Sequence, residues 1–191
     1  MKGDSAIKTV QDLNGKKVGV FTIPHTSSRQ IGYLNNKYSI KAEIIATGNL
    51  SASFAALKAG KVDAFWSSTG EALKYVDSGE LRALVSMNDV YPQPLASVGV
   101  WATEDVIQKD PGLVTKFVKA ILETVKYLKE NPNYAVDLVA KKLNVPKDVA
   151  SKVVSVLDWS VTGRGGGQDL VAGVSNNWVV ARDSGAVPAS V

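Results

Sequence analysis

The feature that most constrains the fold is an alternation of short strand-like runs with helical segments across the first half of the chain. The strand-like runs are apolar and rich in β-branched residues, and they occupy residues 16–22, 42–47, 62–66 and 81–86. The segments between them have helical patterns, at residues 27–36, around Phe54 and Leu57, and at residues 71–76. Strands that alternate with helices of this length predict βαβ units and a largely parallel sheet. The fold class is therefore α/β.

Turn and capping residues divide these elements. Asn14-Gly15 precedes the first strand, and Pro24 ends it. Thr26 or Ser27 is expected to cap the helix that follows, because a hydroxyl there can accept a hydrogen bond from a free backbone N–H group. Gly60 is suited to end the second helix.

The chain changes character beyond Pro94. One more strand is predicted at residues 97–102, followed by a region that is almost wholly helical. Asp110-Pro111 is a helix start, and Asn131-Pro132 stops the same helix. Apolar residues recur in it at intervals of three and four, at Leu113, Phe117, Ile121, Val125 and Leu128. Further helices are predicted at residues 134–143, 147–157 and 170–183.

The helical half has apolar faces but supplies no set of strands to bury them. We therefore expect residues 10–97 to form one α/β lobe. Residues 98–191 are expected to be a crossover strand and C-terminal helices that belong to another lobe. The N-terminal part of that lobe is either truncated from the N-terminus of this chain or supplied by another chain.

Composition excludes several classes of function. The net charge is +4, from 22 Lys and Arg against 18 Asp and Glu, and the basic residues are dispersed, which gives no support for nucleic-acid binding. No apolar run approaches the ~20 residues that span a bilayer, so membrane insertion of this segment is not expected. There is no cysteine, and no cluster of His, Asp and Glu has the spacing of metal ligands. We expect no metal, no cofactor and no catalytic residues.

Several segments together resemble a known family. Residues 4–20 (DSAIKTVQDLNGKKVGV) resemble the stretch that opens the second lobe of type II periplasmic binding proteins. Further matches follow at residues 56–66 (ALKAGKVDAFW), 110–114 (DPGLV) and 129–143 (KENPNYAVDLVAKKL). They cover most of the chain, and each alone is moderately specific. The chain resembles the nitrate/sulfonate/taurine solute-binding family, which also includes pyrimidine-precursor binders.

This resemblance implies a fold and a function. It implies a type II periplasmic-binding-protein fold of two α/β lobes that close on a small ligand, with about the first third of the usual protein outside this chain. It implies a solute receptor that delivers an oxyanion, a sulfonate or a pyrimidine-like molecule to an ABC permease. The expected location is extracytoplasmic, although the N-terminus lacks the apolar core of an export signal.

Candidate ligand-binding residues follow the first strand. In open α/β sheets ligands lie at the carboxyl ends of strands, and there the chain has Thr22, Thr26, Ser27, Ser28 and Arg29. Hydroxyls and free N–H groups at a helix start suit an oxyanion, and Arg29 could add a charge-assisted contact. In the alternative interpretation, Thr26 or Ser27 only caps the helix and Arg29 is solvated.

A second candidate segment follows the strand at residues 62–66. Trp66 could pack on ligand carbons while Ser67 and Ser68 bind its polar end, or Trp66 could be ordinary core beside a serine loop. The resemblance places this segment at the ligand cleft. His25 is the single histidine, and we expect it to be incidental.

Two other classes of function remain open. Some relatives of the fold are pyrimidine-precursor enzymes, but the cysteine cluster associated with them has no counterpart here. LysR-type regulators use the same fold to sense effectors, and an upstream DNA-binding segment would distinguish them from a receptor.

Overall fold

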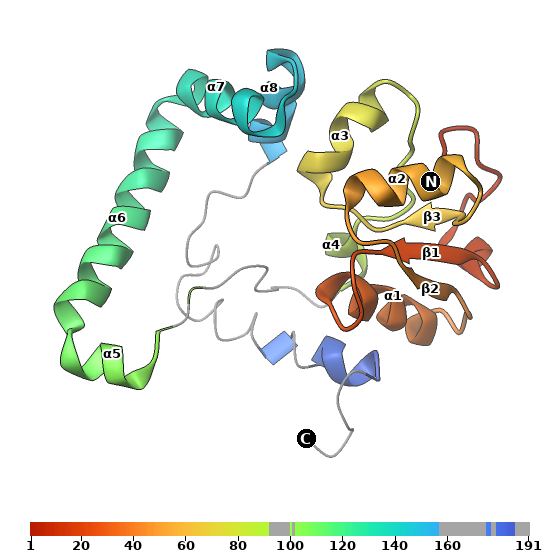
Figure 1. Cartoon of the computed structure of the whole chain (residues 1–191), viewed down its shortest axis with the longest axis horizontal. Helices are drawn as coiled ribbons and strands as arrows, with labels where there is room; N and C mark the ends of the chain where they lie inside the picture. Colours follow the sequence, from red (N-terminus) through yellow and green to blue (C-terminus); the bar gives the residue numbers. More distant parts are fainter. Residues whose placement is uncertain (92–99, 101, 157–174, 177–178, 186–191) are drawn as a thin grey trace. The chain divides into compact units, whose positions relative to one another are not determined.

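The computed structural model describes residues 1–91, 100, 102–156, 175–176 and 179–185. The chain divides into two compact units, drawn in Figure 1. Unit 1 comprises residues 1–95 and 172–191, and unit 2 comprises residues 96–171. The lobe boundary predicted between residues 97 and 98 stays a prediction.

Unit 1 is built on a small parallel sheet. Among the described residues, β1 (Lys17–Val20), β2 (Glu43–Ala46) and β3 (Ala64–Phe65) pair in the order β2-β1-β3. Val18 of β1 lies opposite Ile44 of β2 and Ala64 of β3. The predicted parallel α/β arrangement is therefore confirmed, although each strand is shorter than its apolar run.

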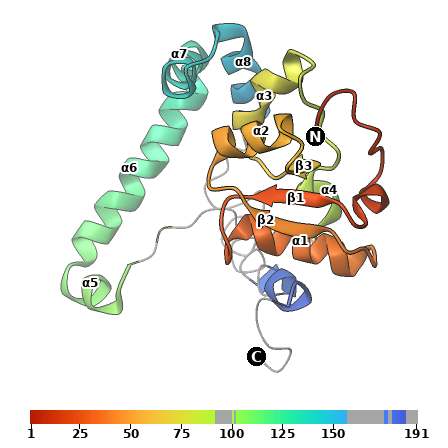
Figure 2. The same ribbon diagram turned by 45° about the vertical axis from the view of Figure 1, so that its right-hand side comes forward.

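The helices that connect these strands lie on opposite faces of the sheet. α1 (Thr26–Lys37) links β1 to β2, and α2 (Leu50–Lys58) links β2 back across β1 to β3 (Figures 1 and 2). The direction of winding thus reverses between β1 and β3, which is where open α/β sheets commonly bind ligands.

The core of unit 1 fills both faces of the sheet. On one face, Val18 and Val20 pack with the α1 residues Ile31 and Leu34, all of them buried. On the other, buried Leu57 of α2 packs with Val62 and Leu81. Since burial of each such side chain contributes about 1.5–3 kcal/mol, these contacts fix the strand ends relative to the helix starts.

Short elements complete unit 1. They are a 3₁₀ helix at Val10–Leu13, α3 (Thr69–Asp77) and α4 (Met87–Val90). Residues 175–176 and 179–183 are helical, as predicted for that part of residues 170–183. Val180 and Ala181 are buried, and the Asn36 amide of α1 donates to the Asp183 carbonyl.

The strand predicted at residues 81–86 is wrong. Leu81 makes one isolated antiparallel bridge to Lys2, and residues 82–86 are not in a strand. Leu84 and Val85 are partly buried against the core without a strand partner. Their apolar character is explained by this packing in the core and not by a place in the sheet. Strand β3 spans two residues and pairs with β1.

The predicted cap of α1 is also wrong. The N-cap is His25, which has extended backbone angles (φ −155°, ψ 163°), and Thr26 is the first helical residue. The His25 ring accepts the N–H that a Thr or Ser oxygen was expected to accept. A side chain with a nitrogen lone pair thus fills the place of the hydroxyl.

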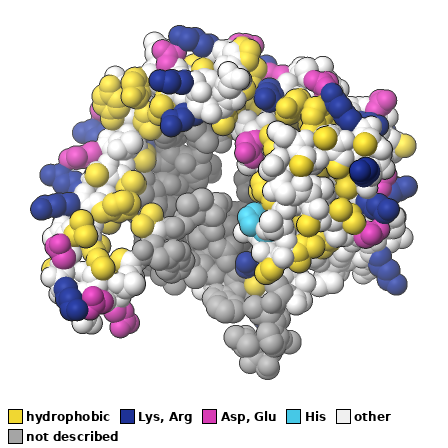
Figure 3. Space-filling view, in the orientation of Figure 1, with side chains coloured by type: hydrophobic (Ala, Val, Ile, Leu, Met, Phe, Trp, Pro, Cys, Tyr) yellow, Lys and Arg dark blue, Asp and Glu magenta, His cyan; other side chains and the backbone are white. Residues whose placement is uncertain are grey.

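Unit 2 consists of α5 (Glu104–Lys109), α6 (Pro111–Glu130), α7 (Pro132–Leu143) and α8 (Lys147–Val156) in its described part. The predicted start of α6 is confirmed, because the Asp110 carboxylate accepts the Leu113 N–H at 2.9 Å. No residue of α6 is buried, and Phe117 of its apolar stripe is 46% exposed. Apolar side chains line the same helix in Figure 3. Most of the strand predicted at residues 97–102 lies outside the described residues.

Candidate functional site

The loops that follow β1 and β3 lie next to each other at the carboxyl edge of the sheet. These loops, residues 21–25 and 66–68, are called here the carboxyl edge. The backbone N–H of Trp66 donates to the Gly19 carbonyl at 2.8 Å, which holds the end of β3 against the end of β1. The two segments predicted to bind ligand are therefore brought together.

Three aromatic rings form a cluster at this edge. The ring centroids of Phe21 and Trp66 lie 5.2 Å apart, those of Phe21 and His25 6.0 Å, and those of His25 and Trp66 6.4 Å. All three residues are half-buried. Trp66 meets both other rings edge-to-face, and the Phe21–His25 pair is tilted. Such pairs fix ring orientation, so this ring cluster gives the carboxyl edge a defined apolar surface.

Ser27 holds the first loop in place. Its side chain is fully buried, and its hydroxyl accepts the Phe21 N–H at 3.3 Å and lies 2.9 Å from His25 Nδ1. The Ser27 N–H also donates to His25 Nδ1 at 3.1 Å. The hydroxyl thus connects the end of β1 to the helix cap.

Ser28 is used in a similar way. Its buried hydroxyl accepts the His25 N–H at 3.0 Å and donates to the His25 carbonyl at 2.8 Å. Thr22 and Thr26, by contrast, are exposed. The structure therefore places both serine hydroxyls in hydrogen bonds within the loop, and it places the two threonines at the surface.

Arg29 lies on a different face of α1. It is exposed, and its charge acts on Tyr91, whose pKa is raised overall by burial and by the neighbouring Tyr33. Tyr33 and Lys37, four and eight residues further along the helix, both donate to the Val90 carbonyl. Arg29 therefore shares the helix face of Tyr33 and Lys37, whereas the ring cluster meets the face that carries Gln30.

Gln30 is a site residue that the sequence did not suggest. The indole N–H of Trp66 donates to the Gln30 side-chain oxygen, across 36 positions of sequence. Phe21 and His25 were also missed as members of the site. The sequence did contain an indication of their role. Residues 21, 25 and 66 are all aromatic, and they follow strands that end at the same edge of the sheet.

The two serines after Trp66 differ in their contacts. Ser67 is half-buried and its hydroxyl donates to the Ser68 carbonyl at 3.2 Å. Ser68 is exposed and donates to the Glu71 carboxylate at 2.7 Å. A ligand that used either hydroxyl would have to replace these surface contacts, which cost little to exchange with solvent.

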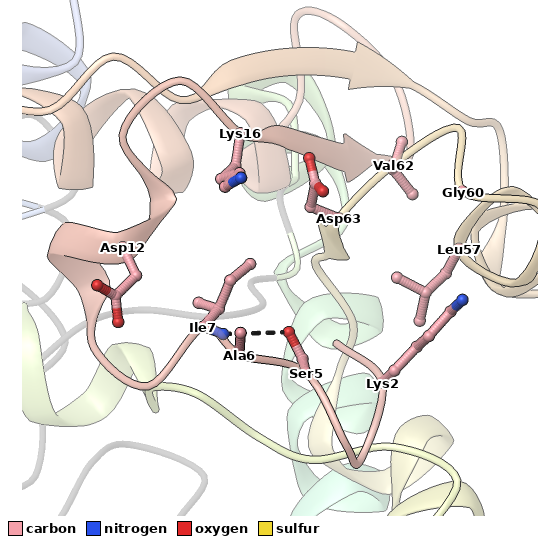
Figure 4. A pocket seen from close by; sticks show the side chains of 10 residues that line it. All are labelled: Lys2, Ser5, Ala6, Ile7, Asp12, Lys16, Leu57, Gly60, Val62 and Asp63. Atoms are coloured by element: carbon pink, nitrogen blue, oxygen red, sulfur yellow. Dashed lines mark hydrogen bonds between the residues drawn. The ribbon is translucent and has the colours of Figure 1, made fainter.

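The structure also contains a cavity at the opposite, amino edge of the sheet. It has a volume of about 410 Å³ and is lined by residues that include Lys2, Lys16, Asp12 and Asp63 (Figure 4). Both carboxylates are already in use: Asp63 accepts the Lys17 N–H, and Asp12 accepts the N–H groups of the residues that precede its helix. These hydrogen bonds lower the pKa of Asp12. This cavity lies away from the starts of α1, α2 and α3, and the carboxyl edge is the stronger candidate.

A comparison with protein families matches residues 1–135 to the family described as NMT1/THI5 like. This match spans more than half of the chain. The chain belongs to the NMT1/THI5-like family. The resemblance inferred from the sequence to the nitrate/sulfonate/taurine type of solute-binding protein is thereby confirmed. No curated protein matches this NMT1/THI5-like chain significantly.

Among solved structures, this family member is similar to the alkanesulfonate-binding protein SsuA from Xanthomonas axonopodis pv. citri bound to MOPS. The TM-score is 0.75 at 14% sequence identity, over 95% of this chain and 62% of the SsuA chain. The chain therefore spans less than two thirds of that protein. At this identity the likeness establishes the fold, and the predicted fold class, a type II periplasmic-binding-protein fold, is confirmed.

The matched SsuA structure is that of a binding protein. Within the described residues, no His, Cys, Asp and Glu side chains gather in a group able to hold a metal ion. None of the helices in those residues combines the length and the apolar character needed to span a membrane.

Proposed function

We propose that this NMT1/THI5-like protein is a solute receptor that binds a small polar or anionic organic molecule at the carboxyl edge. The observation that carries the proposal is the ring cluster of Phe21, His25 and Trp66, which lies where the winding of the sheet reverses. Binding by such a surface needs no nucleophile and no acid–base pair.

The chemistry of the carboxyl edge favours a molecule with an apolar body and a polar end. The rings supply apolar surface, and the side chains around them supply hydrogen-bond donors, as in most small-molecule sites. An organic sulfonate or a pyrimidine-like molecule fits this description, whereas a bare oxyanion such as nitrate matches only the polar end. MOPS, the molecule bound to SsuA, joins a saturated morpholine ring to a sulfonate through a short carbon chain, which supports the sulfonate class.

Thr22, Thr26, Ser27 and Ser28 remain proposed members of the site in two groups. The exposed threonines are free to contact ligand directly. The buried serines orient the loop, because their hydroxyls bond to Phe21 and His25. Trp66 supplies the ring, with Ser67 and Ser68 at its margin, while Arg29 is proposed only as a distant source of positive charge.

The carboxyl edge is proposed as one wall of the binding site, with a further lobe as the other wall. Helix α6 supports this view, since Leu113, Phe117 and Ile121 are all more than a third exposed and an apolar stripe of this kind normally packs against a sheet. We propose that α5–α8 pack against that further lobe. Closure of the lobes would then bury the ligand and create a surface for an ABC permease outside the cytoplasm.

A thermal-shift and calorimetric screen tests the proposed function. The probes are nitrate, taurine, MOPS, 1-hexanesulfonate and unsubstituted pyrimidines. A probe at 100 times its Kd is expected to stabilise the fold by about 2.7 kcal/mol. The matched control is Trp66→Phe, which keeps a ring but removes the indole, and should bind the same probe more weakly. If no class of probe produces heat or a shift, the receptor function is refuted.

A further inference from the structure

We propose that His25 and Gln30 are specificity-determining residues. They present the His25 Nε2–H and the Gln30 NH₂ group to the polar end of the ligand. The site would then accept a group that only accepts hydrogen bonds, such as a sulfonate or carboxylate, and would reject an ammonium group. This inference rests on the proposed function and names the chemistry of the same site.

The tautomer of His25 follows from its helix cap. A backbone N–H can only donate, and that of Ser27 points at His25 Nδ1 over 3.1 Å, so Nδ1 carries a lone pair. Because Nδ1 then has no hydrogen to give, the Ser27 hydroxyl 2.9 Å away donates to the same lone pair, while its oxygen accepts the Phe21 N–H. The hydrogen of the neutral ring must be on Nε2, on the side of the imidazole away from the cap.

The orientation of Gln30 follows in the same way from Trp66. The indole nitrogen has a hydrogen and no lone pair, so its partner must be the amide oxygen of Gln30. The NH₂ group of Gln30 is therefore the end left for another partner. Within the part of the chain that the structure describes, neither this NH₂ group nor His25 Nε2 has a recorded hydrogen bond.

The two donors belong to one surface. His25 meets the Trp66 ring edge-to-face at 6.4 Å, and Gln30 bonds the indole of the same Trp66. His25 and Gln30 are both half-buried, so each is partly accessible to solvent. An apolar surface that carries two donors complements a ligand with an apolar body and an acceptor end, and it offers an ammonium no acceptor.

The first test reads the tautomer directly. The chain has a single histidine, so a long-range ¹H–¹⁵N NMR spectrum of the labelled protein at pH 8 reports only His25. We expect the unprotonated nitrogen to be Nδ1 and the Nε2–H resonance to move on titration with 1-hexanesulfonate but not with hexylammonium. A ring protonated on Nδ1 overturns the inference and leaves the receptor function standing.

Two substitutions of His25 separate its cap from its donor. In His25→Asn, the side-chain oxygen can accept the Ser27 N–H, because Asn is a favoured N-cap, but nothing replaces Nε2–H. In His25→Gln, the amide nitrogen reaches the place of Nε2 and the cap is lost. We expect His25→Asn to weaken 1-hexanesulfonate binding by about 10-fold or more. Both variants lose the ring contacts of His25, so His25→Asn, which keeps the cap, should lose less thermal stability than His25→Gln. His25→Gln should lose stability and keep more of the affinity.

A third variant tests the preference of the site for an anionic over a cationic ligand. Gln30→Glu retains an oxygen for the Trp66 indole but replaces the NH₂ donors with a negative charge. It is expected to weaken 1-hexanesulfonate by about 10-fold or more and to weaken hexylammonium not at all. The inference fails if His25→Asn and Gln30→Glu bind 1-hexanesulfonate like the unchanged protein, or if only other probes of the screen bind. The receptor function fails with it only if no probe binds.

Discussion

Replacement of Ser27 by alanine tests the role given to the buried hydroxyl. The side chain is fully buried, and its oxygen accepts the Phe21 N–H at 3.3 Å and contacts His25 Nδ1 at 2.9 Å. Alanine would leave the Phe21 N–H without a partner in a partly buried position and remove one hydrogen bond from the helix cap. A buried donor left unsatisfied costs about 1–3 kcal/mol, so we expect a loss of about 2 kcal/mol.

The assay is urea unfolding together with a thermal scan. In a chain of this size, a loss of about 2 kcal/mol lowers the Tm by about 4–8 °C. The control is Ser51→Ala, because Ser51 is exposed on α2 and its replacement should change the free energy of unfolding by less than about 0.5 kcal/mol. Equal stability of the two variants would refute the reasoning that Ser27 ties β1 to the cap of α1.

Three further predictions concern other parts of the chain. The pKa of Asp12 lies below its usual 3.8, because backbone N–H groups donate hydrogen bonds to its carboxylate. The ionised carboxylate therefore contributes its full stabilisation of the folded protein above pH 3.8, and this contribution is lost as the pH falls through the pKa that Asp12 has in the folded protein. Asp12→Asn should therefore flatten the acid limb of a stability–pH profile, and an unchanged limb would contradict this. Asp63→Ala, which removes the acceptor of the Lys17 N–H, should lower the free energy of unfolding by about 1 kcal/mol in urea titrations. Phe117→Gln on the exposed face of α6 should reduce binding of a hydrophobic dye and leave the Tm almost unchanged, whereas a large fall in Tm would mean that this face is packed.

Local chemistry explains what the sequence predicted well. The start of α6 could be read from Asp110-Pro111, because a carboxylate cap and a proline in the first turn act within a few residues of each other. The parallel sheet followed from the alternation of strands with helices. The same alternation also predicted the ends of the two strands near which Phe21 and Trp66 lie.

The failures have a tertiary origin. Residues 82–86 have a strand-like composition, but a strand needs a neighbour, and Leu84 and Val85 find their partners in the core instead. The cap at His25 forms because the imidazole is turned so that Nδ1 accepts the Ser27 N–H. This ring orientation cannot be read from the residue type alone. The contact of Gln30 with Trp66 joins segments 36 positions apart, so no local pattern at Gln30 could predict it.

Mapping of ligand contacts by NMR tests the central claim most directly. A ¹H–¹⁵N spectrum of the assigned protein, titrated with each probe of the screen, distinguishes the two edges of the sheet and detects weak binding. We predict that a probe moves the indole N–H of Trp66 and the amides of residues 21–28. Shifts confined to the amides of Lys2, Ser5 and Asp63, around the amino-edge cavity, or no shifts with any probe, would contradict the account.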